Sequence, residues 1–272
     1  MNLESIHVYP VKSLGGVDRT EADVEPWGLR GDRRWLVLNP DGSVLTARER
    51  HLMLGVSARP LDGGAIELTG QGTLRVEPPF DGELVPTALS RLESVRAAGP
   101  AADEWLSREL GTPVRLGWLD DPRRRSVSAD HGGRAGDVLS LADAGPLLLT
   151  TTASLRALND WLEEDAVKRG EEPAAPMVMR RFRPNVVVDG DAEAFAEDAW
   201  EQVQIGDVRF RFSEHCDRCV LTTIDPHTLI AGKEPLRTLA RHRQWDHKTF
   251  FGVRVVPVTE GSIRVGDLVS PA

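Results

Sequence analysis

The segment WLVLNPDGSVLT, residues 35–46, best indicates the fold of this chain. Two runs of mostly apolar or β-branched residues, Trp35–Leu38 and Ser43–Thr46, flank the tetrapeptide NPDG. Proline, aspartate and glycine each favour a tight turn, so the pattern predicts two short strands joined by that turn. A second pair of strands is predicted at Ala65–Leu68 and Thr73–Val76, around a turn with two glycines.

Short apolar runs bounded by turn residues continue along the rest of the chain, and helical patterns are few. Further strands are predicted at Pro146–Thr150, Asn185–Val188, Val203–Ile205, Val208–Phe210, Gly252–Val258 and Ser262–Val265. Helices are predicted at Ala101–Leu110, around the stripe Leu155, Leu158, Leu162 and Ala166, and at Pro235–Arg243. Because strands and helices do not alternate, we expect a mainly β protein with some α (α+β), similar to a β-barrel with peripheral helices.

Composition limits the classes of partner. The chain has 272 residues, 40% hydrophobic and 28% charged, as in ordinary globular proteins. Its net charge of −9 argues against binding nucleic acid. No apolar run approaches the roughly 20 residues that span a bilayer, and no signal peptide begins the chain, so we expect a cytoplasmic protein without a membrane partner.

Two segments divide or interrupt the pattern of strands. The polar, arginine-rich run 120–137 follows the predicted N-terminal strands, and we place a domain boundary near its start, between domains 1–118 and 119–272. A second loop, rich in proline and glutamate, is predicted at 170–176. We therefore expect a β-rich N-terminal domain followed by a second domain with strands and helices.

Both cysteines lie in HCDRCVLTTIDP, residues 215–226. With His242 and His247 they form C-x2-C-x22-H-x4-H, a wider gap than the roughly 12–15 residues of ordinary zinc fingers. A thioredoxin-like couple needs a helix after its cysteines, whereas we expect the β-branched run Val220–Ile224 to be extended. Two buried core cysteines remain an alternative.

The fourth interpretation of the cysteines is a ligand-binding thiolate. Arg218 adjoins Cys219, and an adjacent arginine favours the thiolate form that binds metals. Thr222 and Thr223 add hydroxyl groups beside it. This polar setting favours a bound ligand, whose identity the residues themselves leave open.

Three further segments concentrate positive charge and turn residues. They are YPVKSLGG (9–16), GLRGDRRW (28–35) and MRRFRPN (179–185). Arginine binds phosphate in a bidentate manner, and glycine lets backbone N–H groups approach an oxyanion. Solvated arginines paired with carboxylates are the alternative, but three such segments and a polar thiolate together favour a multivalent anion.

Five motifs in this order resemble the MOSC family, which is named for the C-terminal domain of molybdenum cofactor sulfurase. They are YPVKS (9–13), DRRW (32–35), RFRPN (181–185), EDAW (197–200) and CDRCVLTTIDP (216–226). They are most similar to the amidoxime-reducing branch and its bacterial relatives, which carry an N-terminal MOSC β-barrel domain. The resemblance implies a MOSC-type β-barrel fold with an N-terminal β-rich domain over 1–118 and a MOSC domain over 119–272.

The resemblance also implies a cofactor, molybdenum held by a pyranopterin dithiolene. In the family the second cysteine of the motif ligates the metal, so the resemblance assigns Cys219 as the molybdenum ligand and catalytic residue. The residues assigned to the pterin and its phosphate are Lys12, Ser13, Arg33, Arg183, Asn185 and Arg218. Cys216 is expected to be a supporting neighbour.

The activity implied is reduction of N-hydroxylated compounds such as hydroxylamines, amidoximes and N-hydroxy base analogues. Because no cysteine follows Cys219, we expect no iron–sulfur domain here, and electrons from a separate ferredoxin, flavodoxin or cytochrome. A carrier of molybdenum cofactor or sulfur without reductase activity is the alternative. Pyridoxal phosphate is a further family-level option, for which Lys12 is the candidate Schiff-base lysine among Lys12, Lys168, Lys233 and Lys248.

Overall fold

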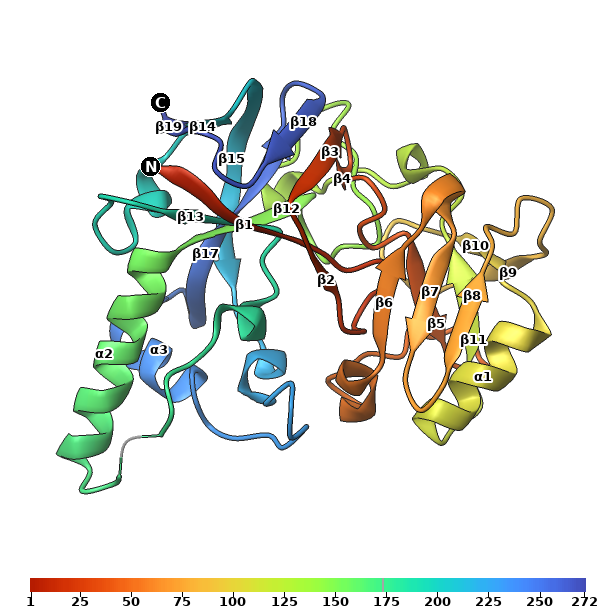
Figure 1. The fold of residues 1–272 in the computed structure, drawn as a ribbon, viewed down its shortest axis with the longest axis horizontal. Helices are drawn as coiled ribbons and strands as arrows, with labels where there is room; N and C mark the ends of the chain where they lie inside the picture. Colours follow the sequence, from red (N-terminus) through yellow and green to blue (C-terminus); the bar gives the residue numbers. More distant parts are fainter. Residues whose placement is uncertain (173) are drawn as a thin grey trace. The chain divides into compact units, whose positions relative to one another are not determined.

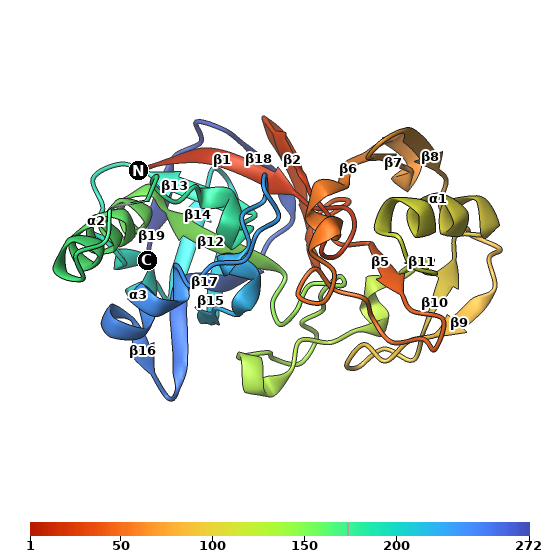
Figure 2. The ribbon, with the colours of Figure 1, turned by 90° about the horizontal axis from the view of Figure 1, so that it is seen from below.

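A computed structural model describes residues 1–172 and 174–272, which form two compact units (Figures 1 and 2). Unit 1 comprises Met1–Ile6, Thr20–Val24 and Leu147–Ala272, and unit 2 comprises His7–Arg19 and Glu25–Pro146. This division differs from the domain limits 1–118 and 119–272, which stay a prediction. The predicted loop 170–176 contains Pro173, which lies outside the described residues.

The main sheet of unit 1 has the strand order β19-β14-β15-β17-β12-β13-β1, and β16 pairs with β17. Its strands are β1 (Asn2–Val8), β12 (Leu147–Thr151), β13 (Val186–Asp189), β14 (Gln202–Ile205), β15 (Val208–Asp217), β16 (Gln244–Trp245), β17 (Lys248–Pro257) and β19 (Val269–Pro271). Most neighbours are antiparallel, and the two longest strands, β15 and β17, pair at the centre. In unit 1, β18 (Gly261–Arg264) also pairs with β3 (Glu21–Glu25).

One part of unit 1 corrects the expectation that strands and helices do not alternate. Strand β12 leads directly into helix α2 (Thr152–Lys168), and β13 then pairs parallel to β12. A parallel pair needs a crossover of a dozen residues or more, and α2 supplies it. The helix begins where the Thr151 side chain accepts a hydrogen bond from the Ser154 backbone N–H, 3.1 Å away.

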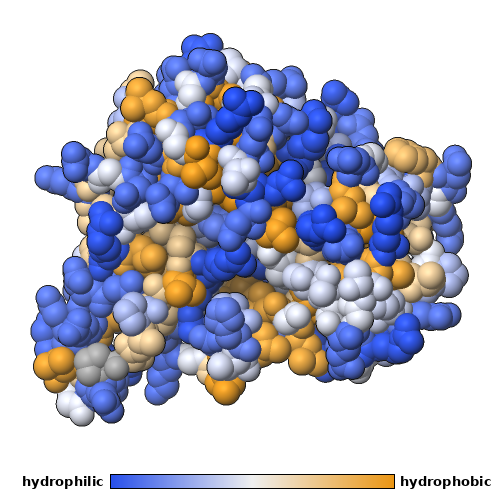
Figure 3. All heavy atoms as spheres, in the orientation of Figure 1, coloured by the Kyte–Doolittle hydropathy of each residue, from blue (hydrophilic) through white to orange (hydrophobic). Residues whose placement is uncertain are grey.

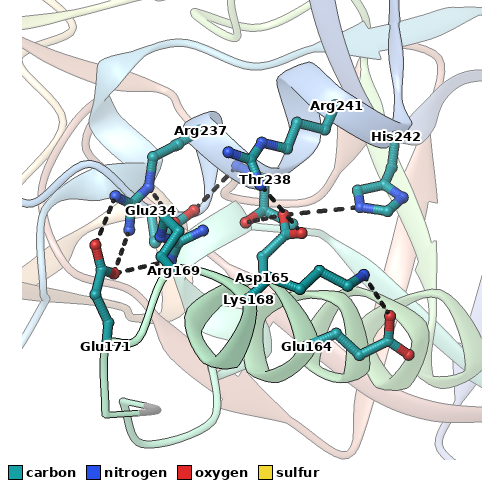
Figure 4. A network of polar contacts seen from close by, with 10 residues as sticks. All are labelled: Glu164, Asp165, Lys168, Arg169, Glu171, Glu234, Arg237, Thr238, Arg241 and His242. Atoms are coloured by element: carbon teal, nitrogen blue, oxygen red, sulfur yellow. Dashed lines mark hydrogen bonds and ion pairs between the residues drawn. The ribbon is translucent and has the colours of Figure 1, made fainter.

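Helix α3 (Leu236–His242) lies beside α2 and is tied to it by polar contacts (Figure 4). Asp165, a buried residue of α2, forms an ion pair with Arg241 at 3.2 Å and accepts a hydrogen bond from the Thr238 hydroxyl. Beneath the helices, Phe182 stacks on Phe251 with ring centroids 4.0 Å apart. The two helices therefore cover an aromatic core next to β17.

Unit 2 contains two small sheets and helix α1 (Pro100–Leu110). One sheet has the order β5-β11-β10-β9 and the other β6-β7-β8. Their strands are β5 (Trp35–Leu38), β6 (Ser57–Pro60), β7 (Ile66–Thr69), β8 (Thr73–Val76), β9 (Leu84–Pro86), β10 (Ser94–Ala97) and β11 (Arg115–Trp118), and the short β2 (Val17–Arg19) and β4 (Gly28–Leu29) also belong to this unit. The predicted β7–β8 hairpin and helix α1 are confirmed.

The turn predicted at Asn39–Gly42 forms, but the strand expected after it does not. Gly42 has φ +86° and donates its N–H to the Asn39 carbonyl, as the turn requires. The predicted strand Ser43–Thr46 is reduced to a single bridge between Val44 and Leu38. β5 pairs with β11 along its whole length, and the local segment stays beside β5, where the Leu45 N–H donates to the Val37 carbonyl at 2.9 Å.

The fold class is confirmed: strands dominate, with α1, α2 and α3 at the periphery. Among the described residues the named strands form no closed barrel, although a single bridge between Asn2 and Leu268 links β1 to the residue before β19. Among the residues that the structure describes, no helix is both long and apolar enough to cross a membrane. On the face drawn in Figure 3, hydrophilic residues cover most of the surface and hydrophobic residues form small separate patches.

Candidate functional site

Lys12 lies shortly after β1 and is buried in unit 2. Its ammonium group donates to the Leu141 carbonyl at 3.0 Å and forms an ion pair with Asp143. Burial lowers the pKa of Lys12 below the usual value of lysine, although Asp143 acts in the opposite direction. The side chain therefore joins the YPVKS segment to residues 141–143, far along the chain.

Arg33 is held in the same group by a buried carboxylate. Asp32 is 1% exposed and accepts hydrogen bonds from the Arg33 guanidinium at 2.5 Å and from the Tyr9 backbone N–H at 2.8 Å. Burial disfavours the charge of Arg33, but Asp32 outweighs this effect and the pKa of Arg33 is raised. The guanidinium also lies over the Tyr9 ring, 4.8 Å from its centroid. Asp32 thus fixes both cationic segments of unit 2.

Ser13 and Arg33 both have positive φ, 70° and 48°, a region that non-glycine residues adopt infrequently and often at functional sites. The expected role of the glycines after Ser13 is not supported by their contacts. Gly15 donates its N–H to the Val56 carbonyl, and a Cβ on Gly16 would come within 2.5 Å of the Tyr9 ring. These glycines serve close packing within the protein.

In unit 1, Cys219 is exposed and begins a single 3₁₀ turn, Val220–Thr223. This turn corrects the expectation that Val220–Ile224 is extended. Two threonine hydroxyls explain the difference: Thr222 donates to the Cys219 carbonyl at 3.0 Å and Thr223 donates to the Val220 carbonyl at 2.8 Å. These local bonds outweigh the β propensity of the run.

Cys216 is buried near the end of β15 and has a different environment from Cys219. The Arg218 guanidinium donates to its sulfur at 2.8 Å and to the Phe182 carbonyl at 2.7 Å. The described contacts of the Arg218 guanidinium are with Cys216 and Phe182, and its expected action on Cys219 stays a prediction. Arg218 joins the cysteine motif to the segment that carries Arg183.

A second guanidinium lies near Cys216. Arg254 of β17 forms ion pairs with Glu214 at 2.5 Å and Asp217 at 3.0 Å. Burial opposes its charge, but electrostatic interactions with Cys216, Glu214 and Asp217 outweigh burial, so the pKa of Arg254 is raised. Charge-assisted contacts therefore fix the end of β15 on both sides of Cys216.

Arg183 and Asn185 flank Pro184 at the start of β13. Arg183 has φ +55° and its backbone N–H closes the 3₁₀ turn Met179–Phe182. Asn185 is 1% exposed, and its side-chain oxygen accepts from the Leu148 backbone N–H at 3.2 Å. The described contacts of Asn185 thus include the edge of β12, and its role toward a cofactor stays a prediction.

An ion pair joins the end of the cysteine motif to the RFRPN segment of unit 1. Arg181 contacts Asp225 at 2.6 Å and donates to the Thr223 carbonyl. Asp225 also accepts from the backbone N–H groups of Thr228 and His227, and these hydrogen bonds hold the pKa of Asp225 below its usual value. The turn after Cys219 is therefore anchored to the RFRPN segment.

The structure groups the predicted residues within each unit. Lys12, Ser13 and Arg33 belong to unit 2, whereas Arg183, Asn185, Arg218 and Cys219 belong to unit 1. Sequence reasoning missed Asp143 and Arg254, and it gave Asp32 no role, since neither an isolated aspartate nor an arginine in an apolar strand stands out. His242, considered as a zinc ligand, stacks on Trp161, and within residues 1–172 and 174–272 no three metal-ligating side chains are grouped.

Comparison with known proteins is consistent with this architecture. The model of the MOSC N-terminal beta barrel domain matches residues 1–113, and that of the MOSC domain matches residues 136–270. Human mitochondrial amidoxime-reducing component 1 is 34% identical, with 96% of this chain and 80% of the relative aligned. The Xenopus laevis protein of the same name is 33% identical, with 96% of this chain and 79% of the relative aligned.

A second type of relative matches to a similar extent. Mitochondrial amidoxime reducing component 2 of Rattus norvegicus is 31% identical, with 98% of this chain and 82% of the relative aligned. Both family models lie in the order that the sequence motifs predict, and together they account for most of the chain. The chain therefore belongs to the MOSC family and is a homologue of the amidoxime-reducing components.

Proposed function

We propose that this protein binds molybdenum cofactor and reduces N-hydroxylated compounds with electrons from a separate protein. The observation that carries the proposal is 34% identity, over 96% of the chain, to a protein named for amidoxime reduction. The exposed thiol of Cys219 adds a chemical reason, because a solvent-accessible thiolate is a soft ligand of the kind that such metals accept.

The residues present fit the proposed cofactor by their chemistry. A pyranopterin phosphate needs cationic donors, and a buried lysine and two arginines in the left-handed region are groups of that kind. The metal needs one protein thiolate, and Cys219 is the exposed one of the two cysteines. When bound, the molybdenum centre would supply the two-electron reduction of the N–O bond.

Each group of this chain has a defined part in the proposal. Cys219 ligates the metal, and Arg183, Asn185 and Arg218 bind or position the cofactor in unit 1. In unit 2 the predicted cofactor-binding residues are Lys12, Ser13 and Arg33, and Asp143 and Asp32 orient the two cations. Net reduction of a hydroxylamine consumes two electrons and two protons and releases an amine and water.

The electron donor is proposed to be a separate ferredoxin, flavodoxin or cytochrome. The test begins with metal analysis of freshly purified protein, where we expect about one molybdenum per chain, as one ligating thiolate implies. Formation of ammonia from hydroxylamine and of an amidine from an aromatic amidoxime is then measured with a chemical reductant, which removes the need for the donor. The three donor types are added afterwards in its place.

The decisive variant is Cys219→Ala, with Val220→Ala as its control on the same turn. Val220 is 48% exposed, so its truncation tests for general disturbance of the turn. We expect Cys219→Ala to lose both molybdenum and turnover and Val220→Ala to keep them. Full metal and activity in Cys219→Ala would refute the proposal. Molybdenum or a Cys219 persulfide without turnover would instead identify a carrier.

A further inference from the structure

Unit 2 contains a cavity of about 580 Å³ that shares no residue with the groups described above. It is lined by Thr87, Leu89, Arg91, Leu92, Glu93 and Arg124. Its volume lies in the range of small-molecule sites, and its wall combines apolar side chains with a hydroxyl and two guanidinium groups. Such a lining suits an organic molecule that carries a negatively charged group.

Arg91 occupies an unusual backbone conformation at this cavity. Its φ is +60°, and it lies in a turn closed by the hydrogen bond from the Leu92 N–H to the Leu89 carbonyl at 3.1 Å. Glycine or asparagine suits such a position better than arginine does. Strained residues of this kind persist mainly where the surrounding structure or function requires them. The turn therefore holds Arg91 in a backbone conformation that arginine adopts infrequently.

The Arg91 guanidinium is fixed but has donors to spare. Its Nε donates to the Ser126 carbonyl at 2.9 Å, and Nη1 donates to the Ser90 hydroxyl at 3.2 Å. An arginine has five N–H donors, so others remain for a ligand. Among the described residues no carboxylate forms an ion pair with Arg91, and Glu93 is the acidic group in the cavity wall.

Two more arginines lie in the same region. Arg124 is oriented by an ion pair with Asp120 at 2.6 Å and by hydrogen bonds to Ser94 at 2.9 Å. Arg125 is 1% exposed, and its Nη1 donates to two backbone carbonyls, at residues 140 and 142. Burial, and then the charge of Arg91, lower the pKa of Arg125 to about 10. Adjacent positive charges repel, and a bound anion would relieve that repulsion.

We propose that the cavity around Arg91 and Arg124 binds a small phosphomonoester. The fixed guanidinium of Arg91 and that of Arg124 bind the phosphate oxygens, as arginine forks do. Thr87 supplies a hydroxyl at the cavity wall, and Leu89 and Leu92 contact the organic part. A phosphate is favoured over a single carboxylate because its three terminal oxygens can accept hydrogen bonds from both guanidinium groups at once.

The test is calorimetric titration of the full-length purified protein with inorganic phosphate and with glycerol 3-phosphate, at constant ionic strength. Arg91→Asn removes the guanidinium but keeps a residue that tolerates positive φ, so it should fold. Arg75→Gln is the charge-matched control, because Arg75 is an exposed arginine of unit 2 away from the cavity lining. Glu93→Gln removes the opposing carboxylate.

We expect saturable binding of both probes, tighter for glycerol 3-phosphate. Arg91→Asn should weaken binding at least about tenfold, as loss of one charge-assisted hydrogen bond implies. Glu93→Gln should strengthen it, and Arg75→Gln should leave it unchanged. Absence of saturable binding in the wild type would overturn the proposal. Equal weakening in Arg75→Gln and Arg91→Asn would also overturn it, because it would show attraction by net charge alone.

Discussion

The substitution Arg218→Ala tests whether this side chain organises the cysteine motif from inside the protein. It removes the donors to the Cys216 sulfur at 2.8 Å and to the Phe182 carbonyl at 2.7 Å. It also removes a guanidinium that lies 5.5 Å from the centroid of the Phe182 ring. Phe182 is fully buried, so its carbonyl has poor access to water as a replacement partner.

The expected loss follows from these contacts. Leaving a buried carbonyl unsatisfied costs about 1–3 kcal/mol, and a cation–π contact contributes about 0.5–1 kcal/mol. We therefore expect Arg218→Ala to lower the free energy of unfolding by about 2–4 kcal/mol, or Tm by roughly 5–10 °C. Arg218→Lys keeps the charge but not the planar fork, so its loss should be intermediate.

The assay is thermal unfolding of the full chain followed by circular dichroism, with Arg209→Ala as the control. Arg209 is an exposed residue of the same strand, β15, and its truncation should change stability by less than about 0.5 kcal/mol. A second readout is the reaction of Cys216 with a thiol reagent in a Cys219→Ser background. Loss of Arg218 should accelerate that reaction by loosening the buried end of β15.

The reasoning would be refuted if Arg218→Ala and Arg209→Ala had the same stability. It would equally fail if Cys216 stayed as unreactive without Arg218 as with it. Either result would show that the contacts of Arg218 with Cys216 and Phe182 contribute nothing measurable.

Three other substitutions test separate features. Burial raises the pKa of Glu197, so the protonated side chain contributes fully to stability below the unfolded pKa. That contribution is lost as pH rises through the folded pKa. Glu197→Gln should abolish this pH dependence of the free energy of unfolding, measured by urea unfolding at a series of pH values. Asp165→Ala removes the buried carboxylate that pairs with Arg241 between α2 and α3. We expect the free energy of unfolding to fall by about 1–3 kcal/mol in the same assay. Gly16→Ala places a methyl group 2.5 Å from the Tyr9 ring and should cost about 1–3 kcal/mol or more, whereas unchanged stability would contradict the packing role.

Local chemistry predicted a large part of the fold. Helix α1 begins at Pro100 and ends before Gly111, which has a left-handed backbone conformation. Proline at the start of a helix and glycine just after its end are both typical of helix limits. The turn at Asn39–Gly42 and the β7–β8 hairpin form as their glycines predict. These features depend on neighbours a few residues apart, whose preferences the sequence displays directly. The ordered motifs likewise indicated the family, because their residue types and order belong to the chain itself.

Local preference was misleading where another interaction of similar strength competed. The β-branched run after Cys219 predicted an extended chain, yet the hydroxyls of Thr222 and Thr223 bond back to carbonyls three residues earlier and form a 3₁₀ turn. The run Ser43–Thr46 likewise forms only a single bridge beside β5, which pairs along its whole length with the distant β11 at Arg115–Trp118. Propensity alone cannot rank such competitors.

The partners of the candidate site residues were decided by tertiary structure alone. Lys12 pairs with Asp143 across 131 positions of sequence, and Arg218 reaches the Phe182 carbonyl across 36. Which carboxylate or carbonyl meets a given cation depends on how the whole chain packs, and no local pattern carries that information. The sequence by itself therefore determined which residues have the chemistry of a site, and the fold determined which of them act on one another.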